Sequence, residues 1–208
     1  MKNILRILVL CFLVAGATAS ASAEKWTLGA GWGGARLRAG RNSAPFLAPK
    51  NVSGDVSYFR LSTGYEVFED LLVETSYFSF SQMQTTHALD FSGGIPQVTP
   101  NNRYHRGVDA ISVGPVFSVP FYGPLSLDLG AAFLVSSFRT TLDGGQEGTR
   151  RFRSTGNFGY TLSGGISTTL AQTITLGATA RYLNFGDTIV STDRLTSGQG
   201  EVFVMLRF

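Results

Sequence analysis

The chain has 208 residues, of which 43% are hydrophobic, 12% aromatic and only 15% charged, and its formal net charge is +3. This content of apolar and aromatic residues excludes an intrinsically disordered chain. After the N-terminal segment, no apolar run approaches the roughly 20 residues that a membrane-spanning helix needs, and the 25 glycines favour turns and strands over helices.

Residues 1–23 have the features of a secretory signal peptide. Two basic residues precede an apolar segment over 7–17, and Ala21-Ser22-Ala23 fits a signal peptidase cleavage site. We therefore expect a mature chain that begins at Glu24, contains no cysteine and forms one domain over residues 24–208.

Eight later segments alternate apolar and polar residues, as β-strands with one apolar face do. Most of them offer about ten residues of this pattern, the length that a tilted strand needs to cross a bilayer. Their polar positions carry mainly Gly, Ser, Thr and Ala, small side chains that fit the lumen of a narrow barrel. In chain order, the segments cover residues 26–39, 59–65, 71–80, 111–119, 125–136, 158–170, 174–182 and 200–208.

Two of these segments depart from simple alternation. In the third, Phe78 and Phe80 are predicted to point inward. In the first, Arg36 and Arg38 continue the face that carries Trp32. Either these arginines lie above the bilayer, or Gly33-Gly34 forms a β-bulge that exchanges the faces; the sequence leaves both explanations open.

The connections between the segments alternate in length. Short ones fall at about 67–70, 121–124 and 171–173, and long ones at about 40–54, 84–106, 140–156 and 187–199. This pattern predicts an all-β protein, an eight-stranded antiparallel up-and-down transmembrane β-barrel with short periplasmic turns and four long extracellular loops. A soluble sandwich or lipocalin is the alternative, but its solvated face would carry many charges.

The C-terminus supplies a local motif. Val202, Val204, Leu206 and Phe208 resemble the C-terminal signal by which outer-membrane barrels are recognised for assembly. Together with Gly164-Gly165, the stretch over 181–185 and the eight strands, this signal makes the mature chain similar to the small barrels of the OmpA and OmpX type. The resemblance implies export to the cell outer membrane and contact with the barrel-assembly machinery.

Six charged residues occupy predicted inward positions. Because an unpaired charge in a narrow lumen costs several kcal/mol, we expect them to form a salt-bridge network that blocks or constricts the lumen. The alternative is that some of them lie at the wet ends and contact only water, most obviously Arg207. The six residues are Arg60, Glu74, Asp128, Arg181, Glu201 and Arg207.

The predicted long loops contain more basic than acidic residues. Arg150, Arg151 and Arg153 form the densest group and are candidates for contact with the phosphates of lipopolysaccharide, because guanidinium groups pair with phosphate through two hydrogen bonds. A solvated loop that happens to be basic would have the same composition.

Sequence motifs for catalysis, cofactors and metals are missing, and one weak enzyme hypothesis remains. His87, Asp90 and Ser92 fall in one predicted loop, and some small outer-membrane barrels modify lipid A with such residues. We expect instead a non-enzymatic barrel with a structural or surface-interaction role through its extracellular loops. A narrow pore is the main alternative, and a lipid A-modifying enzyme is a weaker one.

The expected partners are outer-membrane lipids, lipopolysaccharide and the barrel-assembly machinery. An external ligand is possible but not identified, and we expect no nucleic acid. The chain is expected to be monomeric.

Overall fold

The computed structural model describes the backbone of residues 25–39, 53–81, 83–85, 88–90, 97–99, 103–143, 150–170, 173–188 and 191–208. It describes the side chains of residues 25–38, 54–81, 107–139, 156–170, 173–186 and 195–208. The expected signal peptide and its cleavage site lie outside these residues.

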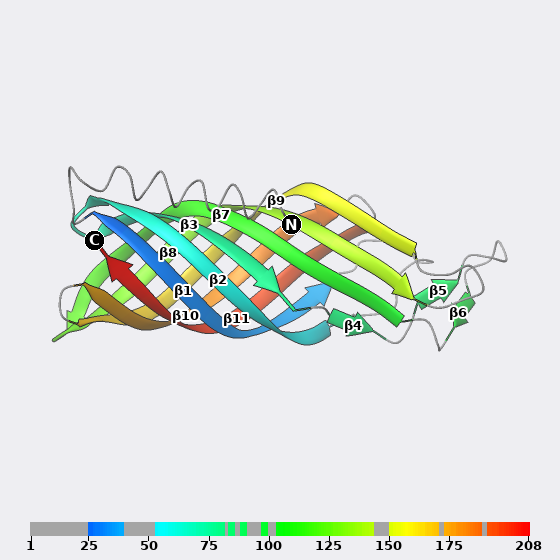
Figure 1. Ribbon diagram of the computed structural model, residues 1–208, viewed down its shortest axis with the longest axis horizontal. Coiled ribbons are helices and arrows are strands. Elements are labelled where there is room, and N and C mark those ends of the chain that lie inside the picture. Colours follow the sequence, from blue (N-terminus) through cyan, green and yellow to red (C-terminus); the bar gives the residue numbers. More distant parts are fainter. Residues whose placement is uncertain are drawn as a thin grey trace.

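Eight long strands form a closed barrel in which every neighbouring pair is antiparallel (Figure 1). Among the residues that the structure describes, no helix is long and apolar enough to cross a membrane. Three short strands, β4 (Met83–Thr85), β5 (Ala88–Asp90) and β6 (Gln97–Thr99), lie between β3 and β7, at the end of the barrel away from the C-terminus. The barrel strands are β1 (Trp26–Ala39), β2 (Ser53–Phe68), β3 (Leu71–Phe80), β7 (Arg103–Tyr122), β8 (Leu125–Asp143), β9 (Arg150–Leu170), β10 (Ile174–Thr188) and β11 (Ser191–Arg207).

The register of the strands sets the width of the barrel. Following the paired residues once around the barrel from Leu28 leads back to Arg38 in the same strand, ten residues further on. A stagger of this kind requires strongly tilted strands, and eight such strands enclose a lumen just wide enough for side chains.

The barrel closes where its first strand, β1, pairs with its last strand, β11. The Trp26 amide donates a 3.1 Å hydrogen bond to the Phe208 carbonyl, and the Phe208 amide donates one of 3.0 Å to the Trp26 carbonyl. From there β1 and β11 remain paired as far as Ala39 and Leu195. No edge is therefore left unpaired between the first and last strands, as a bilayer requires.

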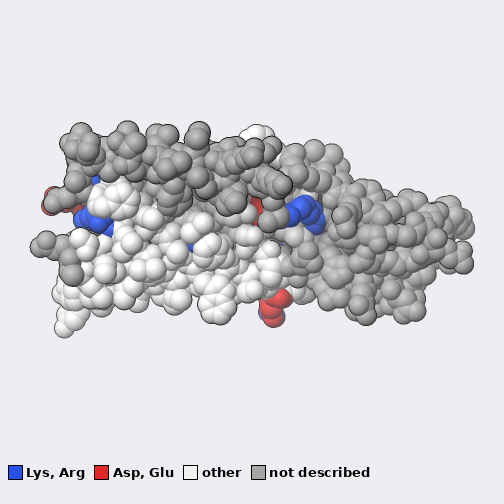
Figure 2. Space-filling model, in the orientation of Figure 1, with Lys and Arg blue, Asp and Glu red and all other residues white. Residues whose placement is uncertain are grey.

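The outer wall of the barrel is apolar and the inward face is mixed. Large side chains such as Trp32, Phe133 and Phe158 point away from the lumen and are 65%, 84% and 79% exposed. Figure 2 shows one side of this wall, where the charged residues of the described part lie at the left end and near the middle of the view, and the surface between these two groups is almost entirely uncharged. Such a surface fits lipid rather than water, because soluble proteins rarely expose apolar patches of this extent.

The strands extend further than the sequence predicts. β10 and β11 continue to Thr188 and Ser191, so most of the expected loop over 187–199 is strand, and β8 and β9 extend over much of the expected loop over 140–156. The sequence of these strand ends lacks the apolar alternation that identifies a strand, although the pairing continues there.

The structure also decides between the two explanations for the first strand. The pairing of β1 with both neighbours has no register shift at Gly33-Gly34, and Arg36 and Arg38 are exposed on the face that carries Trp32. The bulge explanation is therefore wrong. The two arginines lie beyond the apolar part of the outer wall.

Candidate functional site: the barrel interior

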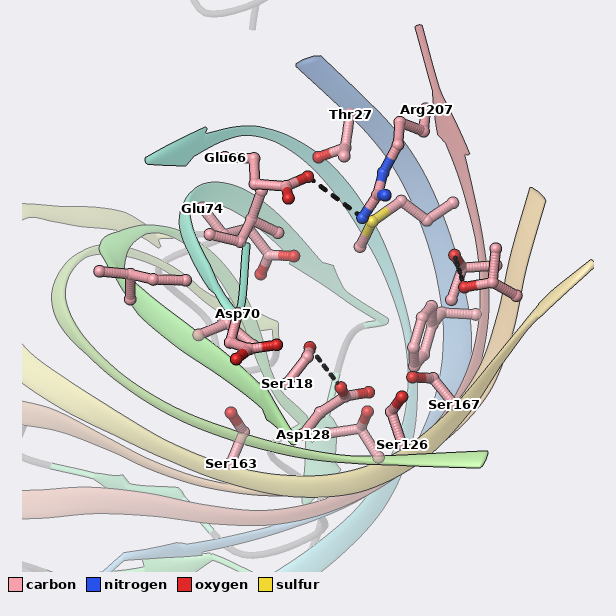
Figure 3. Close-up of a pocket in the computed structure, with 18 of the residues that line it drawn as sticks. Thr27, Glu66, Asp70, Glu74, Ser118, Ser126, Asp128, Ser163, Ser167 and Arg207 are labelled. Atoms are coloured by element: carbon pink, nitrogen blue, oxygen red, sulfur yellow. Dashed lines mark hydrogen bonds and ion pairs between the residues drawn. The ribbon is translucent and has the colours of Figure 1, made fainter. Parts of the chain in front are cut away.

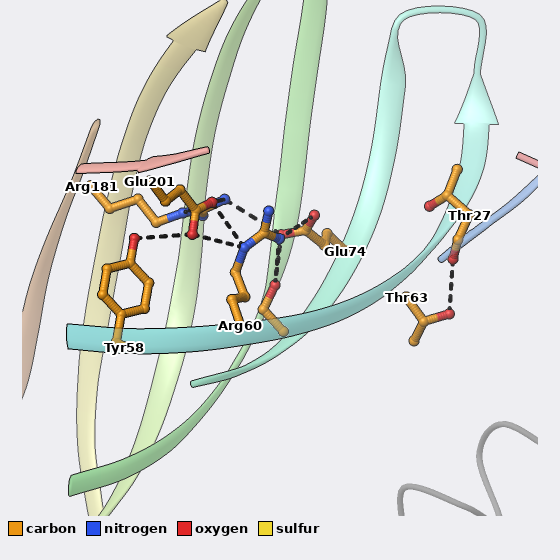
Figure 4. A network of polar contacts seen from close by, with 8 residues as sticks. Thr27, Tyr58, Arg60, Thr63, Glu74, Arg181 and Glu201 are labelled. Carbon is orange, nitrogen blue, oxygen red and sulfur yellow. Dashed lines mark hydrogen bonds and ion pairs between the residues drawn. The ribbon is translucent and has the colours of Figure 1, made fainter. Parts of the chain in front are cut away.

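The centre of the lumen holds two arginines and two glutamates from four different strands (Figure 4). Arg60 on β2 lies 3.0 Å from Glu74 on β3 and 2.9 Å from Glu201 on β11, in each case from a guanidinium nitrogen to a carboxylate oxygen. Arg181 on β10 lies 3.1 Å from Glu201 and 4.0 Å from Glu74. Each arginine thus faces both carboxylates, and the four formal charges cancel.

Neutral hydrogen-bond donors complete this network. The Tyr58 hydroxyl donates a 3.0 Å hydrogen bond to Glu201 Oε2, and the Ser76 hydroxyl donates one of 2.7 Å to Glu74 Oε1. Arg60 is 1% exposed, and its guanidinium carbon lies 5.6 Å from the centre of the Phe203 ring. Charged groups this deeply buried are tolerated when they are both paired and hydrogen-bonded, as they are here.

An apolar layer fills the lumen on the side of the network away from the C-terminus. Its aromatic rings contact one another in series, with centre-to-centre distances of 5.4 Å for Tyr58–Phe80, 5.6 Å for Phe80–Phe185 and 6.1 Å for Phe138–Phe185. The predicted inward direction of Phe78 and Phe80 is confirmed, since the two side chains are 0% and 6% exposed. Further members of this layer are Ala35, Leu37, Val56, Val108, Ala110, Leu134, Leu183 and Leu195.

The lumen on the other side of the network contains a cavity of about 180 Å³ near the end that carries the C-terminus (Figure 3). Arg207 reaches into it and pairs with Glu66 at 3.2 Å, and Asp128 accepts a 2.6 Å hydrogen bond from the Ser118 hydroxyl. Serine and threonine hydroxyls supply most of the remaining polar lining. The interior thus consists of a polar vestibule, a charged layer and an apolar layer.

Several solved structures have a similar architecture. The crystal structure of Neisserial surface protein A matches with a TM-score of 0.60 and 19% identity, over 88% of this chain and 97% of the other. Ail, the attachment invasion locus protein of Yersinia pestis, matches in its complex with the heparin analogue sucrose octasulfate, with a TM-score of 0.50 and 13% identity, over 88% and 99% of the two chains. The chain has the fold of a small outer-membrane β-barrel. No protein-family model and no curated protein matches the sequence.

The structure brings four of the six expected interior charges of this outer-membrane barrel into one cluster. Those four are the residues of the network described above. The other two, Asp128 and Arg207, face the lumen but lie in the vestibule, where their described partners are Ser118 and Glu66. The alternation of a strand reveals which face a residue occupies, but not its height along the barrel axis, so the sequence grouped all six together and named only Arg207 as a candidate for a wet end. Arg207 does lie near that end, where it pairs with Glu66.

Two members of the network were not among the expected residues. Tyr58 precedes Arg60 by two positions and Ser76 follows Glu74 by two, so each shares the inward face of its charged neighbour. A search for polar residues two positions from an inward charge would have found both.

The remaining expected site residues lie partly outside the described side chains. Arg150, Arg151 and Arg153 belong to the first residues of β9, where only the backbone is described, and His87 and Ser92 lie outside the described residues. Within the described part, no group of three or more His, Cys, Asp or Glu residues is arranged to hold a metal ion. The expected assembly signal lies on the outer wall, where its four side chains are 40–62% exposed; they are Val202, Val204, Leu206 and Phe208.

Proposed function

We propose that the protein is a non-enzymatic outer-membrane barrel with a sealed lumen, which acts structurally and through its extracellular segments. The observation that supports this proposal is that the charged layer and the apolar layer follow one another along one narrow lumen. The charged layer contains Arg60, which is almost completely buried, and the apolar layer contains Phe78, Leu37 and Phe185, each 0% exposed.

The two layers oppose permeation for different reasons. An ion or polar solute that reached the charged layer would have to separate pairs whose partners would then remain buried and unpaired, at a cost of several kcal/mol. Beyond it, the apolar layer offers a solute few hydrogen bonds in exchange for its hydration shell, since Ser197 is a rare polar side chain among its aromatic and aliphatic ones. A rearrangement of the charged layer alone therefore leaves the lumen closed.

A role at the cell surface is favoured by the charge of the extracellular side. The sequence of the long connections is rich in arginine, and the exposed Arg36 pairs with Asp55 at 3.0 Å on the outer rim of β1 and β2. A basic rim suits anionic ligands, such as the phosphates of the outer leaflet.

A narrow pore is the second candidate function, and the vestibule is the observation that favours it. The cavity already extends from the C-terminal end to Arg60 and Glu74, so one part of a conduction path exists. The rest would require displacement of the apolar layer.

Planar-bilayer recording separates the two candidates. The purified barrel, shown to be folded by its heat-modifiable migration in gel electrophoresis, is expected to insert without producing sustained conductance. Insertion is verified independently by protease protection in vesicles made from the same lipids. Sustained unitary currents from the unmodified barrel would overturn the proposal and favour the pore.

A further inference from the structure

The vestibule, the cavity at the C-terminal end of the barrel, carries more negative than positive charge. Its outer part is lined by four carboxylates, those of Glu66, Glu69, Asp70 and Asp128, and by one guanidinium group, that of Arg207. Figure 3 shows Asp70 and Asp128 pointing into the same space as the paired Glu66 and Arg207. The network at the inner end adds no net charge, because its two arginines and two glutamates balance one another. A cation that enters from this end is therefore attracted.

Three buried hydroxyl groups also line the vestibule. The side chains of Thr27 on β1, Ser167 on β9 and Thr179 on β10 are only 3%, 7% and 7% exposed, and the first two are labelled in Figure 3. Within the described part of the chain, none of the three hydroxyls takes part in a hydrogen bond. Buried polar groups are almost always hydrogen-bonded, so these hydroxyls indicate an occupant of the cavity that can form hydrogen bonds. They come from other strands than the carboxylates and are an independent observation.

The placement of the carboxylates favours an extended organic cation over a metal ion. Among the described residues, no three acidic side chains are grouped closely enough to hold a metal ion. The carboxylates are instead spread along the wall, since Asp70 and Glu74 both line the vestibule and are separated by about 13 Å of extended strand. Apolar side chains, among them Leu72 and Phe203, line the same cavity. A methylene chain with several ammonium groups matches this mixture, because ammonium groups donate hydrogen bonds to carboxylates and hydroxyls, and methylenes gain from apolar contact.

We propose that the vestibule is a binding site for a linear polyamine that enters from the end of the barrel that carries the C-terminus. The ammonium groups pair with Asp70 and Asp128 and donate hydrogen bonds to the buried hydroxyls, and the methylene chain lies against Leu72 and Phe203. The cavity of about 180 Å³ holds several groups of the size of a methylene or an ammonium. This inference does not rest on the sealed lumen, because the vestibule lies on the outer side of both layers that close it.

Isothermal titration calorimetry of the barrel, folded in a neutral detergent, tests this site. Spermidine is the polyamine probe, and n-butylamine and Mg²⁺ are compared with it at the same ionic strength. We expect one spermidine to bind per barrel. The affinity of n-butylamine should be at least about tenfold lower, because it lacks a second ammonium group and the charge-assisted hydrogen bond that this group forms. Mg²⁺ should also bind more weakly than spermidine, since the described residues offer it no compact set of carboxylates.

Asp128→Asn assigns the binding to the vestibule. The variant is expected to fold, because the asparagine oxygen still accepts the hydrogen bond from Ser118, and its affinity for spermidine should fall at least about tenfold. Asp55→Asn is the matched control, because it removes the same charge from an exposed residue of the outer wall and should leave the affinity unchanged. Should Asp128→Asn fail to fold, Thr179→Val removes a buried hydroxyl with little change of shape, and we expect it to lower the affinity at least about threefold.

Four results would overturn the proposal. The absence of spermidine binding at millimolar concentration would show a vestibule filled by water only. Equal affinities of the Asp128→Asn and Asp55→Asn variants would show a general attraction to the charge of the barrel. Binding of Mg²⁺ as tight as that of spermidine would indicate a metal site, and binding of n-butylamine as tight would exclude a site for an extended polyamine. The conductance of the barrel has no part in this test, so its failure and the failure of the proposed function are distinguishable.

Discussion

Arg60 and Glu201 lie 2.9 Å apart although 141 residues separate them in the sequence. Their strands, β2 and β11, are the two neighbours of β1, so the pair spans the seam where the first and last strands close the barrel. Gly31 on β1 lies beneath the pair, and a Cβ atom there would come within 3.1 Å of the Glu201 carboxylate. The absent side chain leaves the space in which the two charged groups meet.

Replacing Glu201 with glutamine is expected to destabilise the barrel strongly. The substitution preserves the shape of the side chain but leaves Arg60 and Arg181 with one carboxylate, Glu74, between them. Removing one partner of a buried pair costs about 3–5 kcal/mol. Urea unfolding of the barrel reconstituted in lipid, followed by tryptophan fluorescence, measures this free energy.

Asp128→Asn is the matched control for that experiment. It also removes one negative charge from the lumen, but Asp128 lies in the vestibule and the asparagine oxygen can still accept the hydrogen bond from Ser118. We expect a cost below about 1 kcal/mol. Equal effects of Glu201→Gln and Asp128→Asn would mean that the network has no special role in stability.

The sequence predicts the fold well because each barrel strand separates two unlike environments. Val202 and Val204 face lipid while Glu201 faces the lumen, and this difference appears as alternation along the chain. The same alternation identifies Arg60 and Glu74 as inward charges. It gives no axial height, which depends on the stagger between strands far apart in sequence, so Asp128 could not be separated from the network in advance. Arg207 was singled out as a candidate for a wet end, and the structure places it there, although it pairs with Glu66.

The parts of the fold that the sequence did not predict lie where this contrast is lost. The ends of β10 and β11 carry no apolar alternation, so Arg194 and its neighbours appear as loop in the sequence although they continue the strand pairing. Asp109 on β7 also faces outward, where it accepts hydrogen bonds from Tyr77 and Ser79 and pairs with Arg139, and it was missed for a related reason. A carboxylate on the lipid-facing side breaks the alternation, and only the register shows which hydroxyls and which arginine surround it.

Replacing Phe185 with alanine is expected to cost more than replacing Phe133 with alanine. Phe185 is 0% exposed in the apolar layer and contacts Phe80 and Phe138, so truncation leaves a cavity and costs about 3–5 kcal/mol. Phe133 is 84% exposed on the outer wall, where lipid chains refill the space and only a transfer cost of about 1.5–2 kcal/mol remains. Unfolding free energies of both variants in the same lipid test this difference, and a larger loss for Phe133→Ala would contradict the packed layer.

Replacing Gly159 with alanine is expected to disturb the pairing of β9 and β10. A Cβ atom at this position would overlap the carbonyl oxygen of Asn184, so the backbone itself must move. The expected cost is about 2 kcal/mol or more. Gly164 on the same strand is the control, because a Cβ atom there meets only Leu129 at 3.7 Å. Thermal unfolding followed by heat-modifiable migration compares the two variants; equal midpoints would show that the strands adjust freely at Gly159.

Replacing Phe208 with alanine separates its role in assembly from its role in strand pairing. The backbone of Phe208 makes both hydrogen bonds to Trp26, and these remain in the variant, whereas the ring is 42% exposed and points to the lipid side. If the terminal ring is read by the assembly machinery, the amount of folded barrel in the outer membrane falls several-fold in cells. The purified variant, refolded in detergent, should keep its stability to within about 0.5 kcal/mol, as surface substitutions usually do.

Phe121→Ala is the control, because Phe121 is an aromatic residue of the outer wall, 71% exposed, beside the turn between β7 and β8. Equal amounts of folded Phe208→Ala and Phe121→Ala in the outer membrane would show that the terminal ring is not an assembly signal.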